Sequence, residues 1–460
     1  MQRLIAVLLL LTSSLTAAAP PAGQLDPTFG IGGEAILPFD LYFSNYDEGS
    51  SVAADAQGRL YLVGSVLSSP MDRCLGIARF SSEGILDVAG YGEGGRRCHE
   101  ILADSVRLHA SDAAVLANGM LVVAGVDVIG HHPAVCRFDP EGDLDTTFGG
   151  PAAPGCAIFE DVRADRVSPT GGPHFYSYID IAIDHAHADR IFVSIQRYEF
   201  SVMQTRLGRM TSEGSIVPFG KESTVSIFPD EQETFPSDLA FGSEGSLWLG
   251  GGILPSSNHW KFVLARINPD SGLLDPAFNG TGFRTIAFGD YQDIPLAVVP
   301  MPDGNIAIAG GTVKPGMRPA VALLTPSGAY VESFNGGQPF IYDPCMEDEP
   351  TCAINIYAMA MSAVENGKLL IGGYVMDQNN EFSSYTLRLR QNGTPDSNYT
   401  ASNSDFPGFA PIPGPGFSAA MLIQGARAVL GGSRDMGGER RNDFSLIRLS
   451  DGRIFRDGYE

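Results

Sequence analysis

The chain has few basic residues and, beyond its first twenty positions, no long apolar run. It contains 30 Lys and Arg against 53 Asp and Glu, which gives a formal net charge of −23. Such a chain would be repelled by a nucleic-acid backbone or an anionic membrane surface, so we expect no nucleic acid as partner. A bilayer-spanning helix needs about 18 or more consecutive apolar residues. No later stretch comes near that length, so we expect no integral membrane segment in the mature chain.

Common catalytic signatures are also missing. The sequence has no Gly-x-Ser-x-Gly nucleophile elbow, no phosphate-binding loop, no His-Glu-x-x-His and no Cys-x-x-Cys. Each of these motifs fixes a specific chemistry: a nucleophilic serine, a nucleoside triphosphate, a zinc ion or a redox pair. Their absence favours a protein that is not an enzyme, and no cofactor is predicted.

The N-terminus has the order of parts found in a secretory signal peptide. A basic start, Met1-Gln2-Arg3, is followed by an apolar core over residues 4–11 and by small residues up to Ala19. That core is too short to remain as a membrane anchor. We therefore predict a signal peptide over residues 1–19 and a mature protein that is periplasmic or extracellular.

The rest of the chain is built from repeats. The motif Gln24-Leu25-Asp26-Pro27-Thr28-Phe29-Gly30 recurs at intervals of about sixty residues, and two further sequence features recur with it. One feature is a turn followed by an apolar run that ends in Gly, and the other is an Arg within an apolar run. Seven units start near residues 25, 86, 144, 216, 274, 331 and 395.

Each unit predicts four short strands. In the first unit these cover residues 34–39, 51–56, 59–65 and 75–80, as apolar or alternating runs separated by Gly, Asp and Asn. Four strands make one blade of a β-propeller. We therefore predict an all-β fold over residues 20–460, a single seven-bladed β-propeller of four-stranded blades. Its ring is expected to be closed by N- and C-terminal strands.

The repeat resembles that of the delta-60 repeat family of exported, mostly bacterial proteins. The resemblance is carried by residues 142–149 (Gly-Asp-Leu-Asp-Thr-Thr-Phe-Gly), by residues 302–310 and by Leu264-Ala265-Arg266-Ile267-Asn268. It covers nearly all of the mature chain. Units three and five depart from the motif at the Asp position, where they have Ile216 and Val331. The resemblance implies a propeller-like architecture and no established activity.

The recurring Asp and Arg are interpreted as structural. We expect the Arg of one strand to pair with the Asp that begins the next motif, as a charge-assisted lock at a turn. The aromatic residue of the motif should pack under that turn. The residues concerned are Asp26, Asp87, Asp145, Asp275, Asp396, Arg79, Arg137, Arg209, Arg266, Arg388 and Arg448.

Six Cys in an exported chain suggest disulfide bonds. Cys98 and Cys156 occupy equivalent places in two repeats, as do Cys74 and Cys136, and equivalent places favour equivalent bonds. The spacing thus favours Cys74–Cys98 and Cys136–Cys156, with a local Cys345–Cys352. Six Cys allow 15 pairings, so other arrangements stay open.

Three Asp offer the first candidate site. Asp112, Asp180 and Asp238 share one repeat position in units two to four, and Ser51, Ala360 and Ser418 occupy the same position in other units. Three adjacent blades could therefore bring carboxylates to one mouth of a channel, where Ca²⁺ could bind. The favoured alternative is that each Asp caps a strand by accepting local backbone amides.

Two His offer the second candidate. The segment Asp184-His185-Ala186-His187-Ala188-Asp189 has ligand types that a transition metal could use. A plain polar turn is the favoured interpretation of this loop.

The function that follows is a binding or structural scaffold at the cell envelope. A rigid propeller, expected to be a monomer, would present loops to an unknown protein or polysaccharide. The alternative is a hydrolase or lyase working in the channel, with Asp112, Asp180 and Asp238 as acid, base or metal ligands.

Overall fold

The structure is a computed structural model of the 460-residue chain. It describes residues 21–42, 46–70, 72–100, 106–164, 179–199, 202–228, 233–255, 259–290, 292–314, 316–344, 354–399, 406–437 and 442–451. The predicted signal peptide, Cys345 and Cys352 lie outside these residues.

The described chain is all-β, and five of its sheets are antiparallel with four strands in sequence order. Sheet 1 contains β2 (Glu48–Ala54), β3 (Leu60–Leu67), β4 (Arg73–Phe80) and β5 (Arg96–His99). Sheet 2 contains β6 (Leu108–Val115), β7 (Leu121–Asp127), β8 (His132–Phe138) and β9 (Cys156–Ile158). Sheet 3 contains β10 (Ile179–Asp184), β11 (Arg190–Glu199), β12 (Val202–Met210) and β13 (Thr224–Ser226). Sheet 4 contains β14 (Glu233–Phe241), β15 (Leu247–Leu254), β16 (Lys261–Ile267) and β17 (Phe283–Ile286). Sheet 5 contains β18 (Asp293–Pro300), β19 (Ile306–Val313), β20 (Met317–Leu324) and β21 (Phe340–Ile341).

The remaining sheet has seven strands, in the order β1-β27-β26-β25-β24-β23-β22. They are β1 (Glu34–Leu37), β22 (Asn355–Val364), β23 (Lys368–Met376), β24 (Phe382–Leu389), β25 (Phe409–Gln424), β26 (Arg427–Asp435) and β27 (Asn442–Arg448). The 16-residue strand β25 joins two groups of strands. Its first half pairs with β24, and its second half, from Gly416 onward, pairs with β26.

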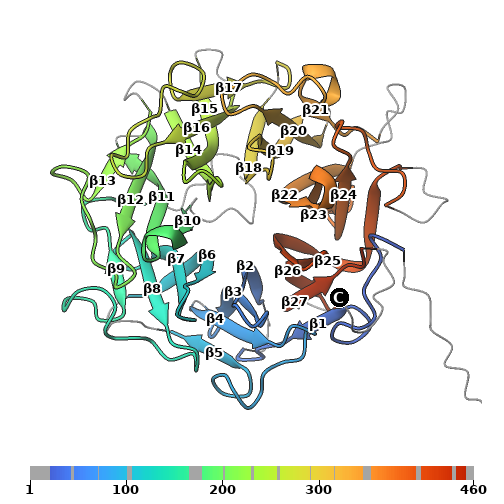
Figure 1. Cartoon of the computed structure of the whole chain (residues 1–460). Helices are drawn as coiled ribbons and strands as arrows, with labels where there is room; N and C mark the ends of the chain where they lie inside the picture. Colours follow the sequence, from blue (N-terminus) through green and yellow to red (C-terminus); the bar gives the residue numbers. More distant parts are fainter. Residues whose placement is uncertain are drawn as a thin grey trace, which may run out of the picture.

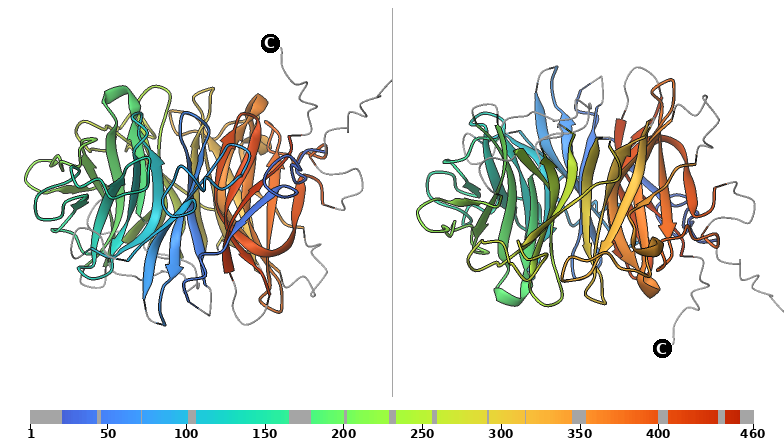
Figure 2. Two further views of the ribbon diagram at one scale, coloured as in Figure 1. Left: turned by 90° about the horizontal axis from the view of Figure 1, so that it is seen from below. Right: turned by 90° about the horizontal axis from the view of Figure 1, so that it is seen from above.

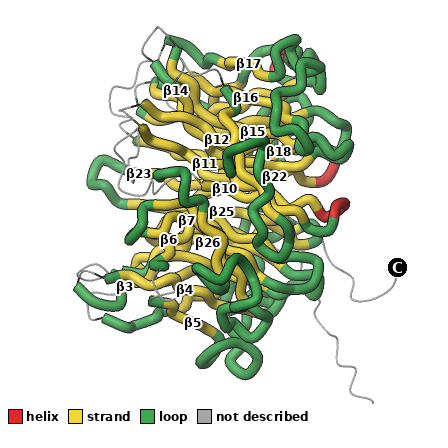
Figure 3. Tube along the Cα trace, turned by 90° about the vertical axis from the view of Figure 1, so that its left-hand side faces the viewer, coloured by secondary structure: helices red, strands yellow, loops and turns green. Residues whose placement is uncertain are grey.

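The sheets stand side by side around a central axis (Figure 1). The first strand of each four-stranded sheet, such as β2, β6, β10 and β18, lies nearest the centre, and the short fourth strand lies at the rim. Seen from the side, the sheets stand next to one another with loops at both faces (Figure 2). Helix is confined, in the described chain, to three short 3₁₀ turns at its edges (Figure 3): His185–His187, Asn335–Gly337 and Glu365–Gly367. No helix among the described residues is long and apolar enough to cross a membrane.

Residues within the turns determine where the chain folds back into a hairpin. After β2, the Asp55 carboxylate accepts the amides of Gln57 (3.0 Å) and Arg59 (2.9 Å), which folds the chain back on itself. Gly58 in this turn has φ +76°, a left-handed conformation that costs glycine little. The run that follows, Leu60 to Val66, is buried throughout and forms β3.

The core lies between neighbouring sheets. One cluster joins Tyr61 and Ile77 of sheet 1 to Leu121 and Val123 of sheet 2, and similar clusters fill the later interfaces. Second strands such as β7 are buried along their full length, because a sheet lies against each face. Each fully buried Val or Leu contributes about 1.5–3 kcal/mol to folding.

The sequence predicts that the four strands of the first repeat form one sheet, but in the structure they belong to two different sheets. The strand over residues 34–37 pairs with β27 near the end of the chain, and its register places Ala35 opposite Leu446. The Leu-Asp motif lies between the third and fourth strands of a sheet, so the sequence repeat is offset by one strand from the structural unit. The N-terminal motif follows the same rule, because Leu25 pairs with Leu449 just after β27.

The aromatic residue of each motif packs against a glycine in a turn of the next sheet. A Cβ added to Gly84 would lie 2.6 Å from the Phe29 ring, and one added to Gly142 would lie 2.7 Å from the Tyr91 ring. Only glycine leaves room for such contacts. The seven pairs are Phe29–Gly84, Tyr91–Gly142, Phe148–Gly214, Phe219–Gly272, Phe278–Gly328, Phe334–Gly393 and Tyr399–Gly23.

Candidate functional site

The three predicted Asp lie at matching places on three adjacent sheets. Asp112, on β6, pairs in register with Ala124; Asp180, on β10, with Ser194; and Asp238, on β14, with Gly250. On β6 and β14 the ladder shifts by one residue just before the Asp, as in a β-bulge.

Each of these side chains accepts a hydrogen bond from the backbone of the next sheet. Asp112 Oδ2 accepts the Ile181 amide at 3.2 Å, and Asp180 Oδ2 accepts the Leu239 amide at 2.7 Å. Asp238 Oδ2 accepts the amide of Val298.

Ser51, at the same place in sheet 1, continues the pattern. Its hydroxyl accepts the Ala113 amide and donates to Asp112 Oδ1 at 2.8 Å. The interpretation of a local strand cap is met at Asp238, whose Oδ1 accepts the adjacent Leu239 amide at 2.8 Å. The donors of the four bonds described above, however, belong to the neighbouring sheet.

The pKa values of the three carboxyl groups are shifted by burial and by the groups' effect on one another. Burial raises the pKa of Asp180 well above its ordinary value, and repulsion by Asp112 and Asp238 raises it further. Burial also raises the pKa of Asp112, against hydrogen bonds from Asp180 and Ser51 that lower it. For Asp238, burial raises the pKa to about 6, although the Val298 amide favours the charged form. Adjacent carboxyls cannot all ionise readily, so ionising one of the three disfavours ionisation of the others.

The cluster borders a cavity of about 320 Å³ on the axis. The first strand of each four-stranded sheet contributes to its lining, as do β22 and β25. One wall is polar and carries Glu48, Ser65 and His109 beside the Asp cluster. The opposite wall is apolar and consists of Leu296, Ala297, Met359, Ala360, Met361, Phe417, Ala419, Ala420 and Met421.

The sequence did not reveal this apolar wall. By strand register the residue equivalent to Asp112 is Ala297 in sheet 5, Ala360 on β22 and Ala420 on β25. Ser418, which the sequence had aligned to the Asp, precedes the bulge instead. The recurring small residue was the available signal, but a one-residue bulge shifts the alignment and hides it.

His185 and His187 lie away from the Asp cluster, on the short turn between β10 and β11. His185 Nδ1 lies 2.7 Å from Asp189 Oδ1, and His187 Nδ1 lies 2.9 Å from Asp184 Oδ2. Both Asp have further partners: Asp189 accepts the Ala117 amide of sheet 2, and Asp184 pairs with Arg190 at 2.6 Å. The His side chains are mostly exposed, as expected of a polar turn.

Within the described residues, no group of three His, Cys, Asp or Glu side chains is placed to hold a metal ion. A calcium site needs ionised oxygen ligands directed at one point. The Asp cluster instead directs oxygens at backbone amides of the neighbouring sheets. Calcium stays a prediction that titration can test.

The repeat Arg form ion pairs with the Asp of the motif that follows. The closest oxygen lies 2.7 Å from Arg79 in Asp87, 2.7 Å from Arg137 in Asp145, 3.1 Å from Arg266 in Asp275, 2.9 Å from Arg388 in Asp396 and 2.8 Å from Arg448 in Asp26. Arg209 has no such Asp in its motif and donates to the Asp270 carbonyl at 2.6 Å.

These guanidinium groups also lie over the aromatic ring of the motif in most units, at 4.9 Å for Arg137 and Phe148 and at 4.7 Å for Arg448 and Phe29. In the fifth unit the Arg position is taken by Leu323, which lies opposite Ala307, and not by Leu324; there Arg284, from β17, lies over Tyr330 at 4.2 Å. This ring is not the motif aromatic of that unit, which is Phe334, so the arrangement of Arg over motif aromatic is not repeated there.

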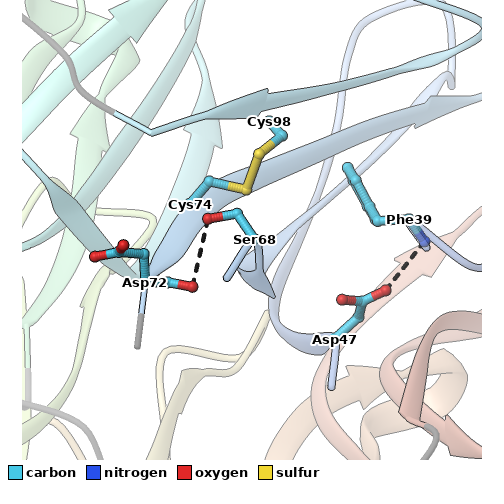
Figure 4. The surroundings of a disulfide bond; sticks show 6 residues. All are labelled: Phe39, Asp47, Ser68, Asp72, Cys74 and Cys98. Atoms are coloured by element: carbon cyan, nitrogen blue, oxygen red, sulfur yellow. Dashed lines mark hydrogen bonds between the residues drawn. A yellow bond between two sulfur atoms is a disulfide. The ribbon is translucent and has the colours of Figure 1, made fainter. Parts of the chain in front are cut away.

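Two of the predicted disulfides are confirmed. Cys74 on β4 bonds Cys98 on β5, and Cys136 on β8 bonds Cys156 on β9, so each joins the third strand of a sheet to the fourth. Figure 4 shows the first bond near the Ser68–Asp72 hydrogen bond of the β3–β4 loop. The short outer strands β5 and β9 are thereby fixed covalently.

Comparisons with known proteins identify the class. The model of a family described as "Domain of unknown function (DUF5122) beta-propeller" matches residues 116–148 and 365–399. Both matches run from the turn before the second strand of a repeat to the aromatic residue of the Leu-Asp motif. The chain is thus a β-propeller protein built from internal repeats. No curated protein sequence matches it.

Several solved structures are similar in outline. Virginiamycin B lyase from Staphylococcus aureus, solved as an inactive variant with quinupristin, has 11% identity and a TM-score of 0.41, over 90% of this chain and 98% of that one. A protein of unknown function from Dyadobacter fermentans has 9% identity and a TM-score of 0.48, over 91% and 97%. The polysaccharide lyase Uly1 has 8% identity and a TM-score of 0.48, over 88% and 90%.

Proposed function

We propose that this chain is an exported, seven-bladed propeller of the delta-60 type that acts as a binding protein, not as an enzyme. The seven-stranded sheet is then two blades that share β25, with β1 as the outer strand of the last blade. Seven aromatic–glycine contacts support a closed ring, because the seventh contact, Tyr399 with Gly23, returns to the N-terminal segment. The two disulfides are typical of an oxidising compartment outside the cytosol.

The axial cavity is the observation that carries the binding function. Its volume of about 320 Å³ falls at the lower end of the range for small-molecule sites, roughly 300–1,000 Å³. Its lining combines a few polar groups with a larger apolar surface, which is the usual composition of a ligand pocket. The surrounding loops are proposed to bind a larger partner at the cell envelope, either a protein or a polysaccharide.

Filling the cavity tests this function. Ala360 lines the apolar wall, and Ala360→Phe would place a ring inside it. Ligand-observed NMR with a fragment library should find compounds that bind the wild type and lose binding to Ala360→Phe. If compounds bind both proteins equally, or none bind the wild type, the cavity is not the binding site.

A channel-sited hydrolase or lyase is the second candidate, and one observation favours it. Carboxyls with raised pKa values beside a cavity are a common feature of acid–base sites. Against it, the same carboxyl oxygens accept backbone amides that join neighbouring sheets. An enzyme would return a bound saccharide cleaved, whereas a binding protein would return it unchanged, and mass spectrometry of the recovered ligand separates the two.

A further inference from the structure

The axial cavity has two opposed chemical characters, and together they restrict what it can hold. Its titratable groups are Glu48 on β2, His109 and Asp112 on β6, Asp180 on β10, Asp238 on β14 and Tyr374 on β23. Among the described residues that line it there is no Lys or Arg. A ligand that brought an anionic group here would meet four carboxyl groups and no fixed cation.

Hydrogen-bonding capacity remains on the polar wall. Ser65 is only 5% exposed, and it lines the cavity. The hydroxyl of Ser237 is buried and has no hydrogen-bond partner within the described chain. Buried hydroxyls are rarely left without a partner, because each such group costs about 1–3 kcal/mol. The Ser237 hydroxyl therefore points to a polar occupant, and Ser65 offers a second hydroxyl on the same wall.

The Asp cluster also has acceptor capacity left. Each carboxylate offers about four lone-pair positions. On Asp238 the amides of Leu239 and Val298 take one position on each oxygen. A donor with several N–H groups could use the rest.

The opposite wall favours an apolar group of adaptable shape. Met359, Met361 and Met421 have flexible thioether side chains that adjust to irregular partners, and Phe417 and Tyr374 add aromatic surface. An aromatic face also attracts a cation.

From this arrangement, and resting on the binding function proposed above, we propose that the cavity binds a small organic ammonium ion that carries an apolar group. The ammonium donates to the Asp cluster and to the two serine hydroxyls, and the apolar group packs against the methionine wall. Binding of the cation favours ionised carboxylates, so complex formation releases protons at acidic pH, where Asp238 is protonated before binding.

Three probes separate the parts of this proposal in calorimetric titration at pH 7.5. We expect 2-phenylethylamine to bind at least about tenfold more tightly than 2-phenylethanol, which lacks the charge, and than methylammonium, which lacks the apolar group; tenfold corresponds to one good charged contact. Equal binding of the amine and the alcohol would overturn the proposal while leaving the cavity a binding site. Failure of all three probes would also overturn it, and the fragment screen described above then decides separately whether the cavity binds anything.

A substitution and a change of pH test whether the cation binds at the Asp cluster. Asp238→Asn should weaken binding of 2-phenylethylamine about tenfold, whereas Asp303→Asn, an exposed turn residue, should leave it unchanged. Binding to the wild type should weaken about tenfold between pH 7.5 and pH 5, as Asp238 gains its proton, and this pH dependence should diminish in Asp238→Asn. A wild-type affinity that is constant over this range would contradict the assignment.

Discussion

Arg137 shows how one side chain can hold two sheets together. It is 3% exposed, pairs with Asp145, covers the Phe148 ring and donates to the Ser212 carbonyl of the next sheet. The Asp145 pKa is lowered: burial would raise it, but hydrogen bonds from Thr147 and the Arg137 guanidinium more than offset that effect. The sequence could suggest this pair because Arg and Asp recur together, but the carbonyl in the neighbouring sheet carries no sequence signal.

We predict that Arg137→Met costs about 3–5 kcal/mol of unfolding free energy, because it leaves a largely buried carboxylate without its partner. Arg97, whose pair with Asp143 is exposed, is the matched control, and Arg97→Met should cost less than about 1 kcal/mol. Urea denaturation of both variants measures the difference. Similar losses of unfolding free energy in the two proteins would show that Arg137 does not hold the two sheets together.

Asp238 predicts an unusual pH dependence of stability. Burial raises its pKa to about 6 in the folded protein, whereas the unfolded chain has an ordinary value near 3.9. The folded state therefore holds more protons between these values, so this residue's contribution makes the protein less stable as the pH rises through that window, and the penalty is complete above about pH 6. Asp180 and Asp112 act in the same direction.

Asp238→Asn should remove this penalty while keeping an oxygen for the Val298 amide. We expect the variant to gain up to about 3 kcal/mol over wild type at pH 7.5 and little at pH 4. Asp303→Asn provides the control for loss of an exposed charge. Urea unfolding across the pH range checks this, and wild-type and variant curves that run parallel would refute it.

The outer strands of the four-stranded sheets are the shortest strands in those sheets. β5 and β9 have four and three residues, and each is joined to the neighbouring third strand by a disulfide. The sequence predicted these bonds because Cys98 and Cys156 recur at one repeat position. It could not locate the bulges on the first strands, since a single extra residue leaves the apolar pattern of Met359 or Ala420 almost unchanged.

Removing the Cys136–Cys156 bond tests what the crosslink contributes. The bond closes a loop of about 20 residues, so the paired change Cys136→Ala with Cys156→Ala should cost about 3 kcal/mol. Chemical denaturation under oxidising conditions measures this, and adding a reductant should bring the wild type toward the variant. A variant as stable as wild type would mean that β9 is held by its hydrogen bonds alone.

At the scale of the whole molecule, the sequence predicted an all-β repeat protein but could not describe the axial cavity. The recurrence of Asp112, Asp180 and Asp238 indicated that carboxyls could meet on the axis. It gave no sign that Met361 and Phe417, from distant repeats, face them, because that depends on how the sheets are arranged around the centre. Long-range arrangement follows from packing between sheets, which leaves little trace in any one repeat.

The N-terminal segment connects the two ends of the described chain. β1 pairs with β27, Asp26 accepts from Arg448 at 2.8 Å, and Glu34 pairs with Arg434. The segment also buries Phe29, Ala35 and Leu37, and each large apolar side chain contributes about 1.5–3 kcal/mol. Deleting residues 1–38 would remove these contacts and leave β27 with an unpaired edge.

We expect the protein that lacks residues 1–38 to unfold at a lower urea concentration and to form oligomers through the open edge of β27. Deletion of residues 1–20 alone, which removes none of these contacts, should leave a stable monomer. Size-exclusion chromatography with light scattering and urea denaturation compare the two. Asp26→Asn, which breaks only the ion pairs with Arg448 and Arg427, should fall between them because β1 itself is retained. If the longer deletion is as stable and as monomeric as the shorter one, the N-terminal strand does not close the ring.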